Sequence, residues 1–265
     1  MQPRANGKLH LSTKRAGNRS VLDALHQSGS SKCLFPRSAR QGLEAVILNT
    51  AGGVTGGDAF SFSAHAAADT ELTMTTQACE RAYKAQPGQT GRIRNRLQVA
   101  AGARVNWLPQ ETILFDGCAL DRRLSVDMDK DASLLMVEPM VFGRHAMGET
   151  LTDIHLSDRI EIRRADQMLY LDAVRLNGNA QAHLAQAFIA GGAGAMASVV
   201  YIADDAEARL DGIRTALPET AGASLIKKDV LVLRILAQDS FVLRLSLLPI
   251  LRRLNGSDLP RCWMT

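Results

Sequence analysis

Alternation of apolar and polar residues is the main pattern in the first two thirds of the chain. In residues 60–66 (FSFSAHA) the even positions are apolar. In residues 92–99 (RIRNRLQV) the odd positions are predicted to point inward, and three arginines occupy the opposite face. The apolar face of a third segment consists of Leu120, Leu124, Val126 and Met128. Successive side chains of a strand point to opposite faces, so each segment is predicted to be a strand with one buried face.

Uninterrupted apolar runs at 46–48 and 134–137 predict strands that are covered on both faces. Turn residues recur roughly every 8–12 positions, a spacing typical of a β-sandwich or of a solenoid-like stack. The stretch from Leu176 to Ala203 has no Asp, Glu, Lys or Arg, yet it is too polar and glycine-rich for a membrane span. We predict a loop and a buried strand there.

Helical patterns occur only late in the chain. Asp204 and Asp205 can cap a helix whose apolar face consists of Ala206, Leu210, Ile213 and Leu217. A second helix is predicted from Asp239 to Leu254. It is apolar on nearly every side, so we expect the protein core or a partner to cover it.

The predicted fold is mainly β. We expect a single domain of stacked, β-helix-like sheets over residues 1–265, with about two α-helices towards the C-terminus. Residues 1–20 are expected to be poorly ordered in part. Of the 265 residues, 46% are hydrophobic and 22% are charged, which excludes a disordered chain, a collagen and a coiled coil. The net charge of +4 is too modest to indicate a nucleic-acid-binding protein.

The cysteines are Cys33, Cys79, Cys118 and Cys262, and none forms a Cys-x-x-Cys pair. This spacing indicates reduced thiols and a cytoplasmic protein. No apolar run follows the N-terminus, so no signal peptide is expected. A zincin or zinc-finger pattern of histidines is absent from the sequence as well.

Residues 49–58 (NTAGGVTGGD) hold four glycines in six positions, which demands an unusual backbone. Neither nucleotide-loop pattern is present, and a strand rather than a helix follows. We therefore predict a structural turn between two strands. Gln77-Ala78-Cys79 is not followed by the residues of a cysteine-protease nucleophile, so Cys79 is interpreted as a packed thiol.

Four motifs in this order resemble the urease accessory protein family UreD, also called UreH. The resemblance spans about residues 43–263, and its motifs are Asn49 with Gly52-Gly53 and Gly56-Gly57-Asp58; Thr75-Thr76-Gln77-Ala78 with Tyr83; Trp107-Leu108-Pro109-Gln110-Glu111 with Phe115; and Phe142-Gly143-Arg144 with Ala146 and Gly148-Glu149. The family often has prolines where this chain has Thr50-Ala51. Asp158-Arg159, Asp172 and Pro260 to Trp263 extend the match.

The resemblance implies a non-enzymatic scaffold in urease maturation. Such a protein binds UreF, which recruits the GTPase UreG, and this hetero-oligomer docks on apo-urease and helps insert nickel. No tightly bound cofactor, nucleic acid or membrane is implied; nickel passes in transit. The implied structural motif residues are Gly52, Gly53, Gly56, Gly57, Gln77, Tyr83 and Arg144.

A protected passage for nickel needs weak, exchangeable ligands, and isolated carboxylates meet that need better than clustered imidazoles or thiolates. The candidates for the passage are Asp58, Glu111, Glu138, His145 and Glu149. Each carboxylate could instead anchor a turn or pair with an arginine such as Arg122 or Arg144. Phe241, Leu245 and Leu248 in the apolar C-terminal helix are the candidates for contact with a partner.

Two alternative functions remain open at this point. The face with Arg92, Arg94 and Arg96 could bind an anionic polymer, although no aromatic residues interleave with these arginines. A β-fold enzyme could use Glu111 and Glu138, although no paired acid–base spacing is present.

Overall fold

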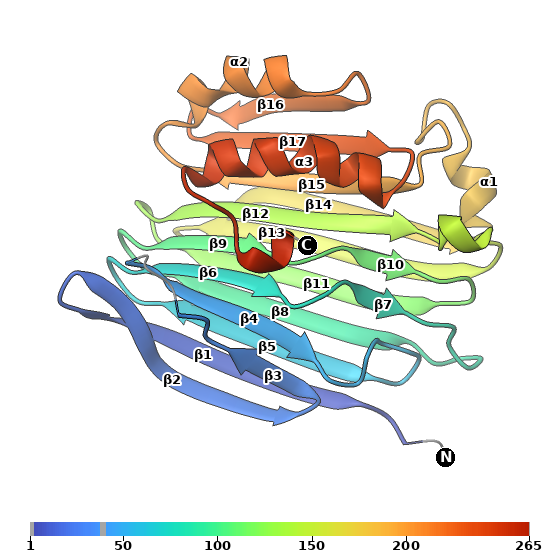
Figure 1. The fold of residues 1–265 in the computed structure, drawn as a ribbon, viewed down its shortest axis with the longest axis horizontal. Coiled ribbons are helices and arrows are strands. Elements are labelled where there is room, and N and C mark those ends of the chain that lie inside the picture. Colours follow the sequence, from blue (N-terminus) through green and yellow to red (C-terminus); the bar gives the residue numbers. More distant parts are fainter. Residues whose placement is uncertain (1–2, 38–40, 265) are drawn as a thin grey trace.

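Two large β-sheets lie face to face in the computed structural model, which describes residues 3–37 and 41–264 (Figure 1). The seven-stranded sheet has the order β14 (Gln167–Gly178), β13 (Ile154–Arg164), β11 (Ala119–Met128), β8 (Gly91–Val99), β5 (Ala59–Ala66), β1 (Asn6–Ala16) and β2 (Arg19–Gly29). The ten-stranded sheet contains β16 (Ala221–Lys227), β17 (Val230–Ala237), β15 (Ala195–Ile202), β12 (Ser133–Phe142), β9 (Arg104–Leu108), β6 (Glu71–Thr76), β4 (Leu43–Asn49) and β3 (Ser31–Leu34). The short β10 (Thr112–Leu114) pairs with β12, and β7 (Glu80–Ala82) pairs with β10.

The chain passes alternately between the two sheets from β4 to β13. Within each sheet the successive strands of this region pair in parallel, as β5, β8, β11 and β13 do in one and β4, β6, β9 and β12 in the other. The turns at 67–70, 100–103 and 129–132 are each closed by a backbone hydrogen bond and stack on one another. This is the geometry of a β-solenoid, and the predicted mainly β, stacked-sheet fold is confirmed.

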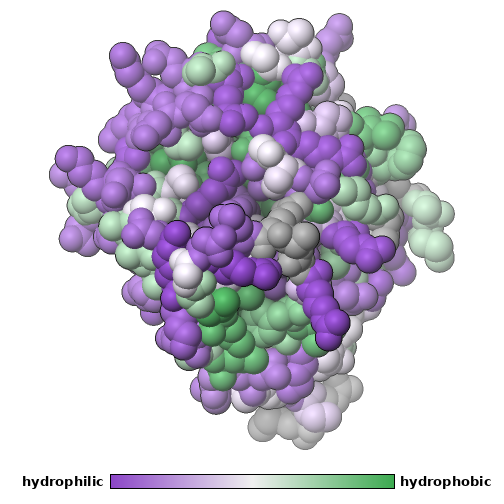
Figure 2. Space-filling model, turned by 60° about the vertical axis from the view of Figure 1, so that its left-hand side comes forward, coloured by the Kyte–Doolittle hydropathy of each residue, from purple (hydrophilic) through white to green (hydrophobic). Residues whose placement is uncertain are grey.

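Three apolar clusters follow from this arrangement. The first fills the space between the sheets, where the alternating strands meet, and includes Leu97, Val126 and Ile160. The second packs the outer face of the ten-stranded sheet against α2 (Ala206–Ala216) and α3 (Ser240–Asn255). The third lies around Leu114, Phe142 and Leu156. The surface in Figure 2 is correspondingly mostly hydrophilic, with hydrophobic side chains gathered towards its lower part.

Both predicted C-terminal helices are present. The Asp239 side chain caps α3 by accepting a hydrogen bond from Val242 N at 2.8 Å, and Gly256 ends the helix with a φ of 69°. Two short 3₁₀ turns, η1 (His145–Met147) and η2 (Arg261–Trp263), and one short helix, α1 (Ala180–Leu184), complete the fold. The helix α1 lies in the stretch for which the sequence predicts only a loop and the buried strand β15. Asn179 caps it through a side-chain hydrogen bond to Ala182 N.

The N-terminal segment needs a correction. The sequence predicts poor order in residues 1–20, but residues 6–16 form β1, which pairs with both β2 and β5. The physical reason is a short alternating pattern in which Leu9, Leu11 and Thr13 face the core and are buried.

The glycine-rich segment joins β4 to β5, which confirms the predicted structural turn. A Cβ atom on Gly53 would lie 2.3 Å from Tyr83 Cε2 and 2.8 Å from the Arg81 carbonyl oxygen. A Cβ atom on Gly56 would lie 2.8 Å from Ala85 Cβ. These glycines therefore permit the loop to lie directly against the segment that follows β7.

Gly53→Ala is expected to lower the free energy of unfolding by about 1–3 kcal/mol, because the backbone carbonyl of Arg81 cannot move away cheaply. Gly212→Ala is the matched control. Nothing lies within 4 Å of its Cβ position in α2, and alanine there should stabilise the protein by about 0.5–1 kcal/mol. Urea denaturation of both variants measures the difference. Equal stability of Gly53→Ala and the wild type would contradict the close-contact argument.

Candidate functional site

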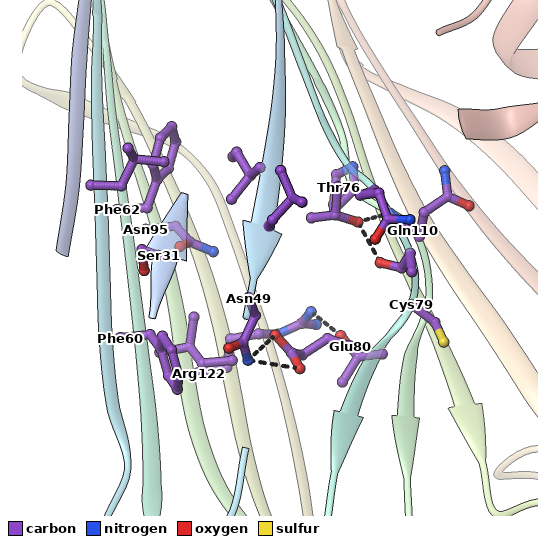
Figure 3. Close-up of a pocket in the computed structure, with 18 of the residues that line it drawn as sticks. Ser31, Asn49, Phe60, Phe62, Thr76, Cys79, Glu80, Asn95, Gln110 and Arg122 are labelled. Carbon is purple, nitrogen blue, oxygen red and sulfur yellow. Dashed lines mark hydrogen bonds between the residues drawn. The ribbon is translucent and has the colours of Figure 1, made fainter. Parts of the chain in front are cut away.

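A cavity of about 220 Å³ lies between the two sheets (Figure 3). Its apolar wall includes Phe60, Phe62 and Trp107. Polar groups line the rest: Asn49, Thr76, Glu80, Asn95, Gln110, Thr112, Arg122 and Glu138. Phe60, Phe62 and Asn95 come from the seven-stranded sheet, and Thr76, Cys79 and Gln110 lie on the opposite side. The volume is enough for several water molecules, and the polar lining offers them partners.

Arg122 is a buried cation in this wall. It occupies an inward position of β11, between Leu120 and Leu124, and its side chain is 7% exposed. Its Nε and Nη2 donate to the two carboxylate oxygens of Asp158 at 2.8 and 2.7 Å, a bidentate pair. Burial disfavours its charge, but the carboxylates of Asp158 and Glu138 outweigh burial and raise the pKa of Arg122.

Glu138 bridges this cation and the ten-stranded sheet. Its Oε1 accepts a hydrogen bond from Trp107 Nε1 at 2.7 Å. Its Oε2 forms an ion pair with Arg122 Nη1 at 2.7 Å but lacks hydrogen-bond alignment with it. The same Nη1 donates a hydrogen bond to Thr112 Oγ1 at 3.0 Å. Burial, helped by the negative charge of Asp158, raises the pKa of Glu138 despite the contact with Arg122.

A third carboxylate, Glu80 of β7, faces the same cavity. Asn49 Nδ2 donates to its two oxygens at 3.3 and 3.1 Å, and the backbone N of Arg81 donates to Oε1 at 3.0 Å. Burial raises the pKa of Glu80 as well. The cluster therefore sets three carboxylates, Glu80, Glu138 and Asp158, against two guanidinium groups, that of the buried Arg122 and that of the exposed Arg81, which also lines the cavity. The excess of one acidic group favours a proton or an entering cation.

Gln110 adds an unused donor. Its side chain is buried, its Oε1 accepts a hydrogen bond from Arg244 at 2.8 Å, and its Nε2 has no partner among the described residues. A buried amide donor without a partner is costly, and ordered water in the adjoining cavity would satisfy it.

Of the five sequence-predicted passage residues, only Glu138 lines the cavity. Asp58 accepts hydrogen bonds from the backbone N atoms of Ala5 and Thr55 and so anchors the glycine-rich turn. Glu111 forms an ion pair with Arg244 of α3 at 2.9 Å. His145 begins η1, and its side chain lies outside the described part of the structure.

Glu149 is paired as well. It forms an ion pair with Arg144 at 2.8 Å, and hydrogen bonding to Arg144 lowers the pKa of Glu149. The Arg144 guanidinium lies 4.3 Å from the ring centre of Phe115, which packs edge-on against Tyr83. These motif residues therefore tie the loop around η1 to the glycine-rich turn, where Tyr83 OH donates to Gly52 O.

Arg122, Asp158 and Glu80 were not among the sequence-predicted site residues. Two of them carried a detectable signal: Arg122 and Asp158 each occupy an inward position of an alternating strand, where an apolar residue is the rule. A charged residue at such a position needs a buried partner. Glu80 carries no comparable pattern, because β7 is only three residues long.

The helix α3, which carries the predicted partner residues Phe241, Leu245 and Leu248, has two different faces. Leu243, Leu247 and Leu251 are buried against the ten-stranded sheet. Phe241 and Leu245 are 68% and 58% exposed, with Val242 beside them. Leu248 is half-buried and packs against the same cluster as the buried face. The helix therefore has one core face and one exposed apolar stripe.

The described residues contain no group of three or more His, Cys, Asp or Glu side chains placed to hold a metal ion. Among these residues there is also no helix with the length and apolar character needed to cross a membrane.

These features define a β-solenoid protein with a polar internal cavity. A family model described as "UreD urease accessory protein" matches residues 5–264. The relatives named "Urease accessory protein UreD" include one from Ruegeria pomeroyi, 65% identical over 96% of this chain and 99% of its own length. Others are from Roseobacter denitrificans (49% identical, covering 99% and 96%) and Rhizobium etli (42% identical, covering 98% and 95%). The chain belongs to the UreD urease accessory protein family, which confirms the resemblance and supports a role in urease maturation.

Proposed function

We propose that this chain is a non-enzymatic scaffold that assembles with UreF and the GTPase UreG on apo-urease and helps insert nickel into the urease active site. Family membership supports the urease part of this proposal. The polar cavity between the sheets supports the nickel part, because it offers oxygen ligands, among them the buried carboxylate of Glu138. We place this function in the cytoplasm.

In this proposal nickel passes through the cavity as cargo. Glu138 and Glu80 supply single carboxylates, which exchange a transition-metal ion faster than a cluster of imidazoles or thiolates does. Arg122 contacts Glu138 and Asp158, so it offsets part of the negative charge that the ion would meet and prevents the carboxylates from trapping it. Thr76 supplies a neutral hydroxyl oxygen along the same wall.

The exposed stripe of Phe241 and Leu245 is the proposed contact with UreF. An apolar stripe at helical spacing suits a helical partner surface. Leu248, at the border between the stripe and the core, would contribute to both folding and binding.

Complementation tests the proposal. The chain is expressed in cells that carry the urease operon of the same source without its UreD-type gene, nickel is supplied, and urea hydrolysis is measured. The wild type should restore activity. Glu138→Gln should lower it about tenfold, because the amide keeps the shape of the carboxylate but is a poor ligand for nickel.

Glu207→Gln is the matched control, since Glu207 is exposed on α2, and no residue of α2 lines the cavity. Co-purification with UreF and UreG shows whether each variant still assembles. Full urease activation by Glu138→Gln in intact complexes would overturn the passage. Failure of the soluble wild type to restore activity would overturn the maturation role itself.

A further inference from the structure

The outer face of the seven-stranded sheet carries a dense set of cations. The register of the parallel strands places Lys8, Ser61, Arg94, Arg123 and Arg159 in one row across the sheet. We define the basic face as the outward side chains Lys8, Arg92, Arg94, Arg96, Arg123, Arg159, Arg163 and Arg175, with the carboxylates Asp121, Asp127 and Glu161 among them.

The charge of this face exceeds that of the whole molecule. The basic face has a net charge of +5, against +4 for the entire chain. Its internal ion pairs are few: Asp121 contacts Arg94 and Arg123, and Glu161 contacts Arg159. Five exposed cations of the basic face form no ion pair with any described residue, and these are Lys8, Arg92, Arg96, Arg163 and Arg175.

The basic face is also broad and open. The helix α3 packs on the other sheet, and Figure 1 shows no helix over the seven-stranded sheet among the described residues. Seven strands spaced by ~4.8 Å span roughly 29 Å, and nine residues of strand span roughly 30 Å. The resulting ~850 Å² equals the area that one partner contributes to a protein–protein interface of standard size.

The composition of the face favours a protein over a nucleic acid. Its outward positions on β1, β5, β8, β11 and β13 hold no Phe, Tyr or Trp on which bases could stack. Asp121, Asp127 and Glu161 interrupt the positive charge and would repel phosphates. On a protein partner they can meet lysine or arginine side chains, while the guanidinium groups pair bidentately with carboxylates.

We propose that the basic face docks an acidic protein surface, which in the proposed assembly is a surface of apo-urease. The identification of apo-urease as this partner rests on the proposed function. A scaffold that joins two partners needs two separate surfaces. The apolar stripe of α3 lies on the outer side of the ten-stranded sheet, so it and the basic face are on opposite sides of the molecule (Figure 1).

The test is the affinity of the full chain for apo-urease and, separately, for UreF, at low and at physiological salt. Arg92→Glu combined with Arg96→Glu should weaken binding to apo-urease about tenfold or more, reduce its salt dependence, and leave binding to UreF unchanged. Lys227→Glu combined with Lys228→Glu is the matched control. It makes the same change of charge at exposed positions at the end of β16, on the other sheet, and should bind apo-urease as the wild type does.

Three results would overturn the proposal: wild-type affinity of the Arg92 and Arg96 variant for apo-urease; an equal loss of affinity in the lysine control; or binding of the wild type to a 30-nucleotide DNA but not to apo-urease. Complementation distinguishes a failure of the docking proposal from a failure of the proposed function. If the wild type and the arginine variant both restore urease activity fully, only the docking surface is wrong. If the wild type fails, the maturation role is wrong, and apo-urease is removed as the acidic partner.

Discussion

Arg122→Met is expected to lower the free energy of unfolding by about 3–5 kcal/mol at neutral pH. The substitution keeps much of the side-chain volume but removes the one cation among the described residues that contacts the buried carboxylates of Asp158 and Glu138. Both carboxyl groups would then be buried without a cation. Glu138 would keep one hydrogen bond, from Trp107. Chemical denaturation measures the loss.

The loss should depend on pH with a defined sign. Burial already raises the pKa of Glu138, and removal of Arg122 raises it further. The folded state then holds a proton that the unfolded state has released, so the stability of the variant falls as the pH rises above the ordinary Glu pKa of about 4.3. The difference from the wild type should therefore be smaller at pH 5 than at pH 7.5.

Arg123→Met is the matched control. The Arg123 side chain is exposed, and its ion pair with Asp121 is long, at 3.6 Å. The effect of this substitution should stay within about 0.5 kcal/mol. Asp158→Asn in the Arg122→Met background should restore part of the stability, because it removes one of the two buried carboxyl groups that have lost their cation. Wild-type stability of Arg122→Met at pH 7.5 would show that the buried ion pairs are not needed to hold the sheets together.

Trp263→Ala should cost about 3–5 kcal/mol, or about 10 °C in Tm. The indole is 1% exposed within the apolar cluster that joins α3 to the ten-stranded sheet. Its Nε1 donates to Leu108 O at 2.9 Å, and the Arg244 guanidinium lies 5.2 Å from its ring centre. The alanine variant would leave a cavity and an unpaired carbonyl where the C-terminal segment closes over the sheet.

Two variants separate these contributions. Trp263→Phe keeps an aromatic ring and loses the hydrogen bond, so it should cost about 1–3 kcal/mol. Met264→Ala changes the next residue, which is 50% exposed, and should stay within about 0.5 kcal/mol. Thermal unfolding of the three variants checks this order. An equal effect of Trp263→Ala and Met264→Ala would show that the C-terminal segment does not contribute to the core.

Local sequence patterns determined the elements of this protein. Alternation in 60–66, 92–99 and 120–128 predicted three strands, because the side-chain period of a strand is a property of the backbone. The capping residue Asp239 and the apolar period after it predicted α3 for the same reason. The close approach of Gly53 and Gly56 to other segments agrees with the prediction of a structural turn.

Only the tertiary structure decided which charges meet. Arg122 contacts Asp158, which is 36 residues away on the adjacent strand, and Glu138 on the opposite sheet. These contacts depend on the parallel register and on the distance between the sheets, which many distant residues set together. The same register aligns the exposed cations into one face, although the sequence scatters them from Lys8 to Arg175. Local patterns follow from the backbone, whereas the cavity and the basic face follow from how the solenoid stacks.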